Sequence, residues 1–235
     1  MLKPRTQFAR LLENLDACEQ RCLLCFQPLT QGMAFHQVFL ESDVLCGECR
    51  KTLKPVNRWI EVDGLNVFAY YEYDDAMSTL LFRFKEVYDQ VLGSVFLHPI
   101  EKFDKRFRNK IIVCAPSSTQ KIEERGFMTL SRILEKSKLV QIEVLRKEGS
   151  AKQSLRTAHQ RNEVRSEITL HSRFLAENRD LLLFDDVVTT GATMAACHAL
   201  LVPIARSLTC VCIAIHPIFL KNSRKSTIIY RKNTI

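Results

Sequence analysis

The chain has 235 residues, of which 46% are hydrophobic and 26% charged, values typical of a globular protein with a sizeable core. No apolar run reaches the roughly 18 to 20 residues of a membrane span, and the N-terminal residues lack the apolar segment of a secretory signal. We therefore expect a cytoplasmic protein without a membrane span, whose nine cysteines suggest metal binding more than disulfides. The net charge of +8 favours nucleic acid, phosphorylated small molecules or anionic lipid as partners.

The N-terminal region combines a predicted helix with a cysteine cluster. Residues 1–17 carry apolar residues at helical spacing and predict a short amphipathic helix. Two C-x2-C pairs follow, Cys22 with Cys25 and Cys46 with Cys49, separated by 20 residues. This spacing suits a closed tetrahedral zinc site whose metal is structural. The alternative is four ordinary buried thiols, but so short a segment has too little core to fold without a metal.

The remainder of the chain predicts an α/β fold. Residues 59–73 have strand character with a turn at Asp63-Gly64, and residues 75–103 have helical spacing. Further strands are predicted at 111–115, 140–146, 181–184 and 208–215, and helices at about 122–137 and 191–201. Short apolar strands that alternate with helices indicate a parallel sheet flanked by helices, whose ligands bind beyond the carboxyl ends of the strands.

The segment Leu181–Met194, LLLFDDVVTTGATM, places two acids and three threonines around a glycine directly after an apolar strand. Gly191 permits a backbone that a β-carbon disfavours, so the amides of residues 189–193 can turn inward around a phosphate at the start of a helix. Asp185 and Asp186 then suit the hydroxyls of an attached ribose, directly or through Mg²⁺. The alternative is a set of helix caps, which does not explain consecutive acids followed by three threonines.

The same segment resembles the phosphoribosyl-pyrophosphate (PRPP) binding motif of type I phosphoribosyltransferases. The resemblance implies a catalytic role for Asp185 and Asp186. It also implies a fold of the type I phosphoribosyltransferase kind. The phosphate-binding residues that it implies are Val188, Thr189, Thr190, Gly191, Ala192 and Thr193.

In these enzymes a loop after the first core strand contacts pyrophosphate, and a flexible hood closes over PRPP. The matching loop residues here are Ser117, Lys121 and Arg125, although the two basic residues also fit solvated helix positions. The basic stretch 147–165 resembles the hood, or is a solvated surface. Its candidates for pyrophosphate or nucleic acid are Lys152, Gln153, Arg156, Arg161 and Asn162.

Cysteine knuckles ahead of such a domain resemble the ComF family. Three other stretches support this: a K-x-x-x-D-like stretch within 81–96 that lacks the family's common glycine, the R-G-F segment within 114–127, and AKQSLRTAHQRNEV (151–164), which resembles the family's Q-x-x-L-x-x-x-x-R-x-x-N segment. The resemblance covers roughly residues 18–215. We expect an N-terminal helix and zinc-binding domain over 1–58, a phosphoribosyltransferase-like domain over 59–220 and a basic tail over 221–235.

The family implies a competence protein of DNA uptake and natural transformation. Such a protein would bind PRPP or a related phosphoribosyl ligand with Mg²⁺ and act with a ComFA-like helicase on imported single-stranded DNA. Two alternatives stay open: an active phosphoribosyltransferase in nucleotide or related metabolism, and a nucleic-acid-binding module with a vestigial PRPP loop. The sequence names no acceptor for the ribosyl group. It also lacks a P-loop motif, so the chain is not itself an ATP-driven motor.

Overall fold

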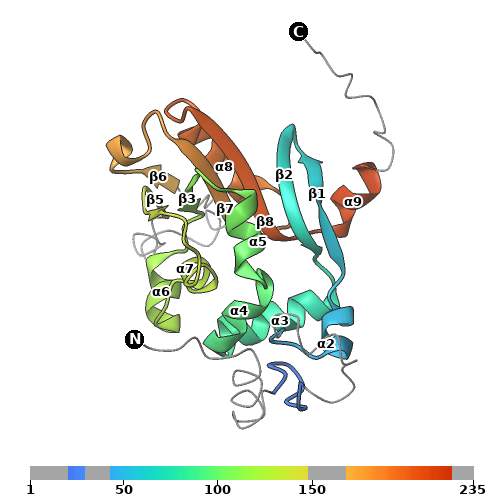
Figure 1. Cartoon of the computed structure of the whole chain (residues 1–235). Coiled ribbons are helices and arrows are strands. Elements are labelled where there is room, and N and C mark those ends of the chain that lie inside the picture. The colour runs from blue at the N-terminus through green and yellow to red at the C-terminus, as the bar shows by residue number, and fades with distance from the viewer. Residues whose placement is uncertain (1–20, 30–42, 148–167, 224–235) are drawn as a thin grey trace, which may run out of the picture. The chain divides into compact units, whose positions relative to one another are not determined.

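A computed structural model describes residues 21–29, 43–147 and 168–223 of the chain (Figure 1). Its internal contacts divide the chain into two compact units, Met1–Thr52 and Leu53–Ile235. The helix predicted at 1–17 and most of the tail 221–235 lie outside the described residues. Within the described ranges, no helix combines the length and apolar character that a membrane span requires.

The first unit consists, in its described part, of two short segments and one helix. A β-bridge between Arg21 and Pro28 closes the first segment into a loop. The amide of Leu23 donates to the carbonyl of Val44 at 3.0 Å and so joins the two segments. Helix α2 (Gly47–Thr52) follows the second segment. The first segment contains Cys22 and Cys25, and the second leads into Cys46 and Cys49, so this junction brings the two knuckles together.

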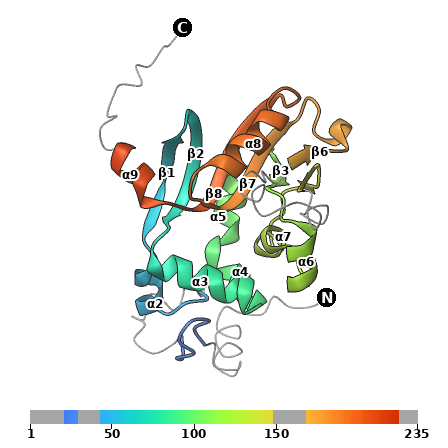
Figure 2. The ribbon, with the colours of Figure 1, turned by 180° about the vertical axis from the view of Figure 1, so that it is seen from behind.

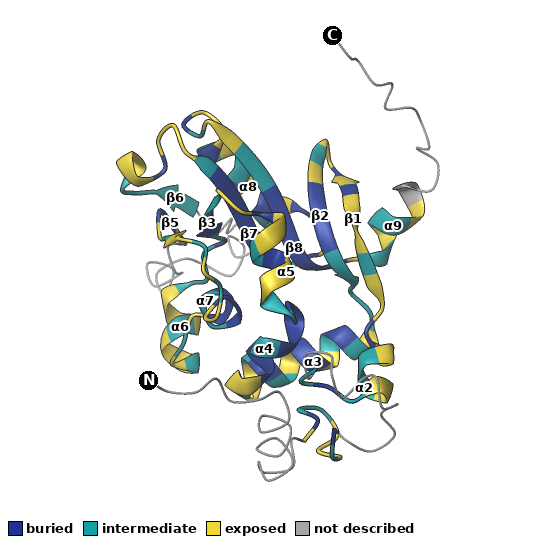
Figure 3. Ribbon diagram, viewed as in Figure 1, coloured by how far each residue is buried: buried dark blue, intermediate teal, exposed yellow. Residues whose placement is uncertain are grey.

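The second unit is built on a six-stranded sheet with the order β1-β2-β8-β7-β3-β4. Its strands are β1 (Pro55–Val62), β2 (Leu65–Glu72), β3 (Ile111–Cys114), β4 (Gln141–Ile142), β7 (Asp180–Val188) and β8 (Ser207–Ile215). All pairings from β2 to β4 are parallel, and β1 pairs antiparallel with β2. Buried residues follow β2, β7 and β8 (Figure 3), as expected of parallel strands covered on both faces. The predicted α/β fold class is confirmed.

Strands β1 and β2 form a tight hairpin. Asp63 and Gly64 both have positive φ angles, 47° and 82°, which is the conformation of a two-residue turn that matches the twist of the strands. The predicted turn is therefore confirmed. The hairpin begins at Pro55, earlier than the predicted start at residue 59, because β1 is an edge strand whose exposed residues give a weak apolar signal.

Helices cover both faces of the sheet. They are α3 (Asp75–Glu86), α4 (Gly93–Phe96), α5 (Ile100–Arg106), α6 (Thr119–Arg125), α7 (Thr129–Ile133), α8 (Ala192–Leu201) and α9 (Pro217–Ser223), with 3-10 turns η2 (Gln90–Leu92) and η5 (Arg173–Leu175). Figures 1 and 2 show α5 and α8 on opposite faces of β7 and β8. The ring of Phe103 on α5 lies 5.8 Å from that of Phe184 on β7. Phe184 therefore points to the α5 face.

Two predicted helices are each divided in the structure. The segment 75–103 breaks after α3, where Tyr88 adopts a φ of 62°, and continues as η2, α4 and α5. The segment 122–137 becomes α6 and α7, because Gly126 adopts a left-handed φ of 73° and ends α6. Apolar spacing is the same before and after such a turn, so the pattern does not reveal the break.

The strand predicted at 140–146 is also divided. Residues 141–142 form β4 and pair with β3, whereas β5 (Leu145–Lys147) pairs with β6 (Ile168–Leu170) in a separate two-stranded sheet. One apolar run therefore contributes a strand to each of two sheets. The strands predicted at 111–115 and 208–215 and the helix predicted at 191–201 correspond to β3, β8 and α8, and these predictions are confirmed.

Candidate functional site

The strand that carries the two acids is longer than predicted. It was expected to end at Phe184, but β7 continues to Val188 and contains Asp185 and Asp186. Asp185 is in register with Cys212 of β8. Because successive side chains of a strand point to opposite faces, the two carboxylates diverge and do not present one shared surface.

Asp185 points into the interior. Since Phe184 faces α5, Asp185 faces α8, where burial and the charge of Asp185 raise the pKa of the Cys197 thiol to about 12. Only 9% of Asp185 is exposed, and one of its oxygens accepts a 2.9 Å hydrogen bond from the amide of Asp186. Burial, followed by the charge of Asp186, raises the pKa of Asp185 to about 7. The positive charges of Lys85 and Lys147 offset part of that shift.

Asp186 points to the opposite face and contacts Lys85 of α3. The Lys85 ammonium lies directly against its Oδ2 atom, and the two side chains are only 19% and 18% exposed. Helix α3 is fixed at its start by Asp74, which accepts a 3.0 Å hydrogen bond from the amide of Met77. Lys85 was not among the predicted site residues. Lys85 is the lysine of the K-x-x-x-D-like stretch, but that pattern does not indicate a contact with Asp186.

The loop after β7 has the features of a phosphate-binding loop. Gly191 adopts a left-handed φ of 79° and begins α8, a helix of ten residues. Thr189 and Thr190 are exposed, and Thr193 is half-buried. Backbone amides at a helix start and threonine hydroxyls are groups that bind phosphate. Of the other predicted loop residues, Ala192 is exposed, whereas the Val188 side chain is buried and can offer only its backbone.

The tip of the β1–β2 hairpin packs against this loop. A β-carbon placed on Gly191 would lie 2.7 Å from Cγ1 of Val62 and 3.7 Å from a carboxylate oxygen of Asp63. A glycine is thus required at position 191, because the backbone has a left-handed φ and because a β-carbon would have no space beside Val62. The hairpin contact was not predicted, because residues so far apart in sequence carry no local signal for it.

The segment after β3 forms one wall of a cavity of about 280 Å³. The amide of Ala115 continues the sheet by donating to the carbonyl of Phe184 at 2.8 Å, and Ser118 forms a β-bridge with Lys147. The lining residues are Cys114, Ala115, Pro116, Ser117, Thr119, Ile122, Met128, Ser131, Gln141, Ile142, Glu143, Leu145, Arg146 and Lys147. The cavity therefore combines apolar lining with hydroxyl groups, two cationic side chains and the carboxylate of Glu143, and it includes the predicted residue Ser117.

The two predicted basic residues of α6 differ in their surroundings. Lys121 is exposed. The side chain of Arg125 is only 8% exposed, and its guanidinium lies 2.5 Å from an oxygen of Glu86 on α3. Arg125 is therefore held by a carboxylate rather than presented to solvent. Outside the described residues lie the predicted hood residues Lys152, Gln153, Arg156, Arg161 and Asn162.

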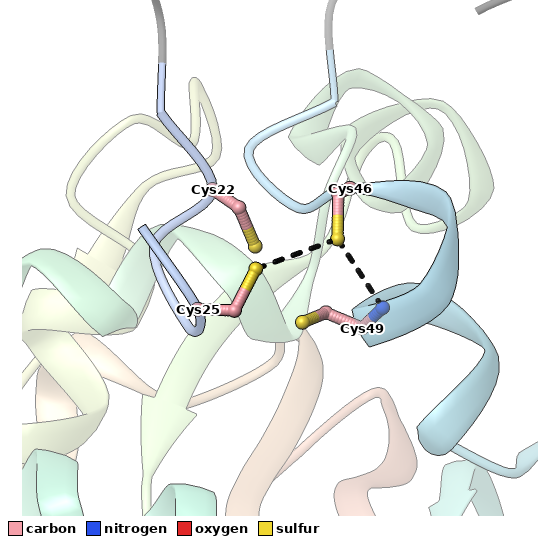
Figure 4. A group of neighbouring side chains, drawn as sticks. All are labelled: Cys22, Cys25, Cys46 and Cys49. Atoms are coloured by element: carbon pink, nitrogen blue, oxygen red, sulfur yellow. Dashed lines mark hydrogen bonds between the residues drawn. The ribbon is translucent and has the colours of Figure 1, made fainter. Parts of the chain in front are cut away.

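The four cysteines of the first unit converge on one point (Figure 4). Their sulfur atoms all lie within 4.8 Å of one another, and the Cys25 and Cys46 sulfurs are 3.7 Å apart. The amide of Cys49 donates to the sulfur of Cys46 at 3.5 Å. Two C-x2-C knuckles with this convergence can hold a metal ion such as zinc.

The pKa values of these cysteines are also consistent with metal binding. Burial raises the pKa of the Cys22 thiol, but hydrogen bonds from the Cys25 and Cys46 amides outweigh it and bring the pKa down to about 6. Burial and the neighbouring sulfurs raise the pKa of Cys49 instead. Thiolates this close repel one another, and a bound cation removes the repulsion.

The sequence has relatives among competence proteins. No protein family model matches the chain. It is 23% identical over 198 residues to the competence protein ComFC of Streptococcus pneumoniae, covering 74% of this chain and 90% of that protein. It is 27% identical over 205 residues to ComFC of Bacillus subtilis, covering 74% of this chain and 85% of that protein. The chain is ComFC-like.

Solved structures of phosphoribosyltransferases also align with this ComFC-like chain. APRTase from Giardia lamblia, complexed with 9-deazaadenine, aligns with a TM-score of 0.40 and 13% identity over 75% of this chain and 88% of that one. HGPRT-ase from Leishmania tarentolae, in complex with GMP, aligns with a TM-score of 0.34 and 13% identity over 61% and 72% of the two chains.

We expect Gly191→Ala to destabilise the ComFC-like chain more than Gly126→Ala. Both glycines have a left-handed φ, which costs another residue about 1–2 kcal/mol, but a β-carbon at Gly126 meets nothing within 4 Å. Overpacking against Val62 should add about 1–3 kcal/mol at Gly191. Urea unfolding of both variants measures the difference, and equal losses would contradict the close approach of the hairpin.

The buried Asp185 should make stability fall as pH rises. Its folded pKa of about 7 lies above the usual value of about 3.9, so the folded state holds the extra proton between these values. The stability contributed by this proton is present at low pH and is lost as pH rises to about 7. Asp185→Asn, which mimics the protonated group, should therefore gain stability relative to the wild type between about pH 4 and pH 7. If urea unfolding gave the same stability difference between Asp185→Asn and the wild type at every pH, the raised pKa of Asp185 would be refuted.

Metal content should depend on the four converging cysteines. Purified protein should hold about one zinc per chain, and Cys49→Ser should lose it because a closed structural site needs all four ligands. Cys114→Ser, which changes a thiol of the second unit, is the control and should keep the metal. Elemental analysis after dialysis measures both, and zinc retained by Cys49→Ser would remove that cysteine from the ligand set.

Proposed function

We propose that this ComFC-like chain is a competence protein that binds PRPP or a related phosphoribosyl ligand at the β7–α8 loop. The observation that carries the proposal is the loop itself. Thr189, the first residue after β7, and Thr190 are both exposed, and they precede the left-handed Gly191 at the start of α8. Such a loop can bind the 5′-phosphate through amides and hydroxyls.

The sugar would lie toward the acid-bearing end of β7. Asp186 is the more accessible of the two acids and is paired with Lys85, so its carboxylate can accept hydrogen bonds from ribose hydroxyls. Asp185 is buried and would act through its hydrogen bond with the Asp186 amide. This division of roles differs from the sequence-based hypothesis, in which both acids face the ribose.

The pyrophosphate would lie toward the segment after β3. Ser117 offers a hydroxyl there, and Arg146 and Lys147 place positive charge beside the same cavity. Mg²⁺, which prefers to share phosphate oxygens and water, would accompany the pyrophosphate and neutralise its charge. Lys121, exposed on α6, is a further candidate for this end of the ligand.

The biological role is proposed from the relatives. Both are named competence proteins, which supports a role in competence. A cytoplasmic role in DNA uptake and natural transformation with a ComFA-like helicase is the finer part of the proposal, and it follows from the resemblance to the ComF family. The net charge of +8 is compatible with contact to imported single-stranded DNA. Zinc in the four-cysteine cluster would be structural, because four thiolates leave no open position for chemistry.

Calorimetry with PRPP and Mg²⁺ on zinc-replete protein tests the ligand. Wild type should bind, and Asp186→Asn should weaken binding by about tenfold, the effect of one lost charged hydrogen bond. Glu101→Gln, which changes an exposed acid on α5, is the matched control and should bind as wild type does. Absence of any heat or thermal shift with PRPP would leave the loop vestigial and the proposal wrong.

A second function, phosphoribosyl transfer, is favoured by the cavity beside Ser117. A volume of about 280 Å³ next to the proposed pyrophosphate end leaves room for an acceptor. An enzyme would release pyrophosphate from PRPP when a suitable acceptor is added. A protein that only binds PRPP would show the calorimetric signal without that release, so the two functions can be separated on one sample.

A further inference from the structure

The end of helix α3 contacts two elements beside the proposed ligand site, β7 and α6. Lys85 contacts Asp186 of β7, and Glu86, the next residue, contacts Arg125 of α6. β7 leads into the phosphate loop, and α6 follows the segment proposed for pyrophosphate. Two adjacent residues of one helix therefore hold one side chain from each of these two elements.

The contact between Lys85 and Asp186 is sheltered from water. Both side chains are less than one-fifth exposed, so their attraction is screened far less than that of a surface pair. Removing one partner from such a pair leaves an uncompensated charge in a poorly hydrated place. Without Lys85, the Asp186 carboxylate would lose the contact that fixes its orientation, and repulsion from the charge of neighbouring Asp185 would favour rotation of its side chain away.

The contact between Glu86 and Arg125 has a different character. Arg125 is only 8% exposed, whereas Glu86 is 48% exposed. Glu86 thus supplies the carboxylate that allows the guanidinium to remain in a sheltered position. Helix α3 is itself anchored by four buried residues, so its last turn is a fixed support for both side chains. These anchors are Met77, Leu80, Leu81 and Phe84.

We propose that Lys85 is a positioning residue of the sugar-phosphate site, which holds Asp186 for the ribose. The neighbouring pair of Glu86 and Arg125 helps to fix the end of α3 that carries Lys85. This inference rests on the proposed function. It assigns Lys85 to the ribose part of the ligand, so ribose 5-phosphate should respond to its substitution and inorganic pyrophosphate should not. Lys85 does not need to touch the ligand for this role.

The test measures the affinity of PRPP, ribose 5-phosphate and pyrophosphate for three variants. Lys85→Met should weaken ribose 5-phosphate and PRPP by about tenfold and leave pyrophosphate unchanged. Lys85→Arg keeps the positive charge and should restore most of the affinity. Lys102→Met, which changes an exposed lysine of α5, is the control and should match wild type.

A purely structural role would not give this pattern. If Lys85→Met weakened ribose 5-phosphate and pyrophosphate equally, or weakened neither, the inference would be overturned while the proposed function stood. Wild type that does not bind PRPP would instead overturn the proposed function and the inference with it. Should Lys85→Met not fold, as judged by thermal unfolding, Lys85→Gln takes its place and the same selective loss is required.

Discussion

The alternation of side chains along β7 is the constraint on which the site depends. Because Asp185 and Asp186 lie inside the strand, one carboxylate enters the core beneath α8 and the other meets α3 on the opposite face. The two then have different chemistry: a buried acid with a raised pKa, and a more accessible acid paired with a lysine. A motif of two adjacent acids thus contains one structural and one accessible group.

Features encoded within a few neighbouring residues were predictable. The turn at Asp63-Gly64, the parallel strands and the left-handed glycine before α8 each follow from local pattern and composition. The convergence of the cysteines follows from the spacing of two knuckles. For the turn, the strands and the glycine, the physical cause acts over a few residues, and therefore the sequence displays it. The two knuckles lie 20 residues apart, but their repeated C-x2-C pattern identifies them as partners.

Contacts between distant segments were not predictable. Lys85 and Asp186 are about a hundred positions apart, and nothing near either residue identifies the other. The breaks at Tyr88 and Gly126 were missed because apolar spacing continues across them. The end of β7 was placed too early, because charged residues signal a strand end even where pairing with β8 continues beyond them.

Because Gly191 and Val62 lie so close together, neither the β7–α8 loop nor the β1–β2 hairpin can change its side chains there independently of the other. The β7–α8 loop of a related chain could not replace this loop unchanged, because the conformation of the loop depends on contact with the β1–β2 turn, which lies far away in the sequence. Directed evolution aimed at new ligands would therefore find more freedom at the outward-facing threonines than at the glycine. Productive changes at the glycine would require a compensating smaller side chain at Val62.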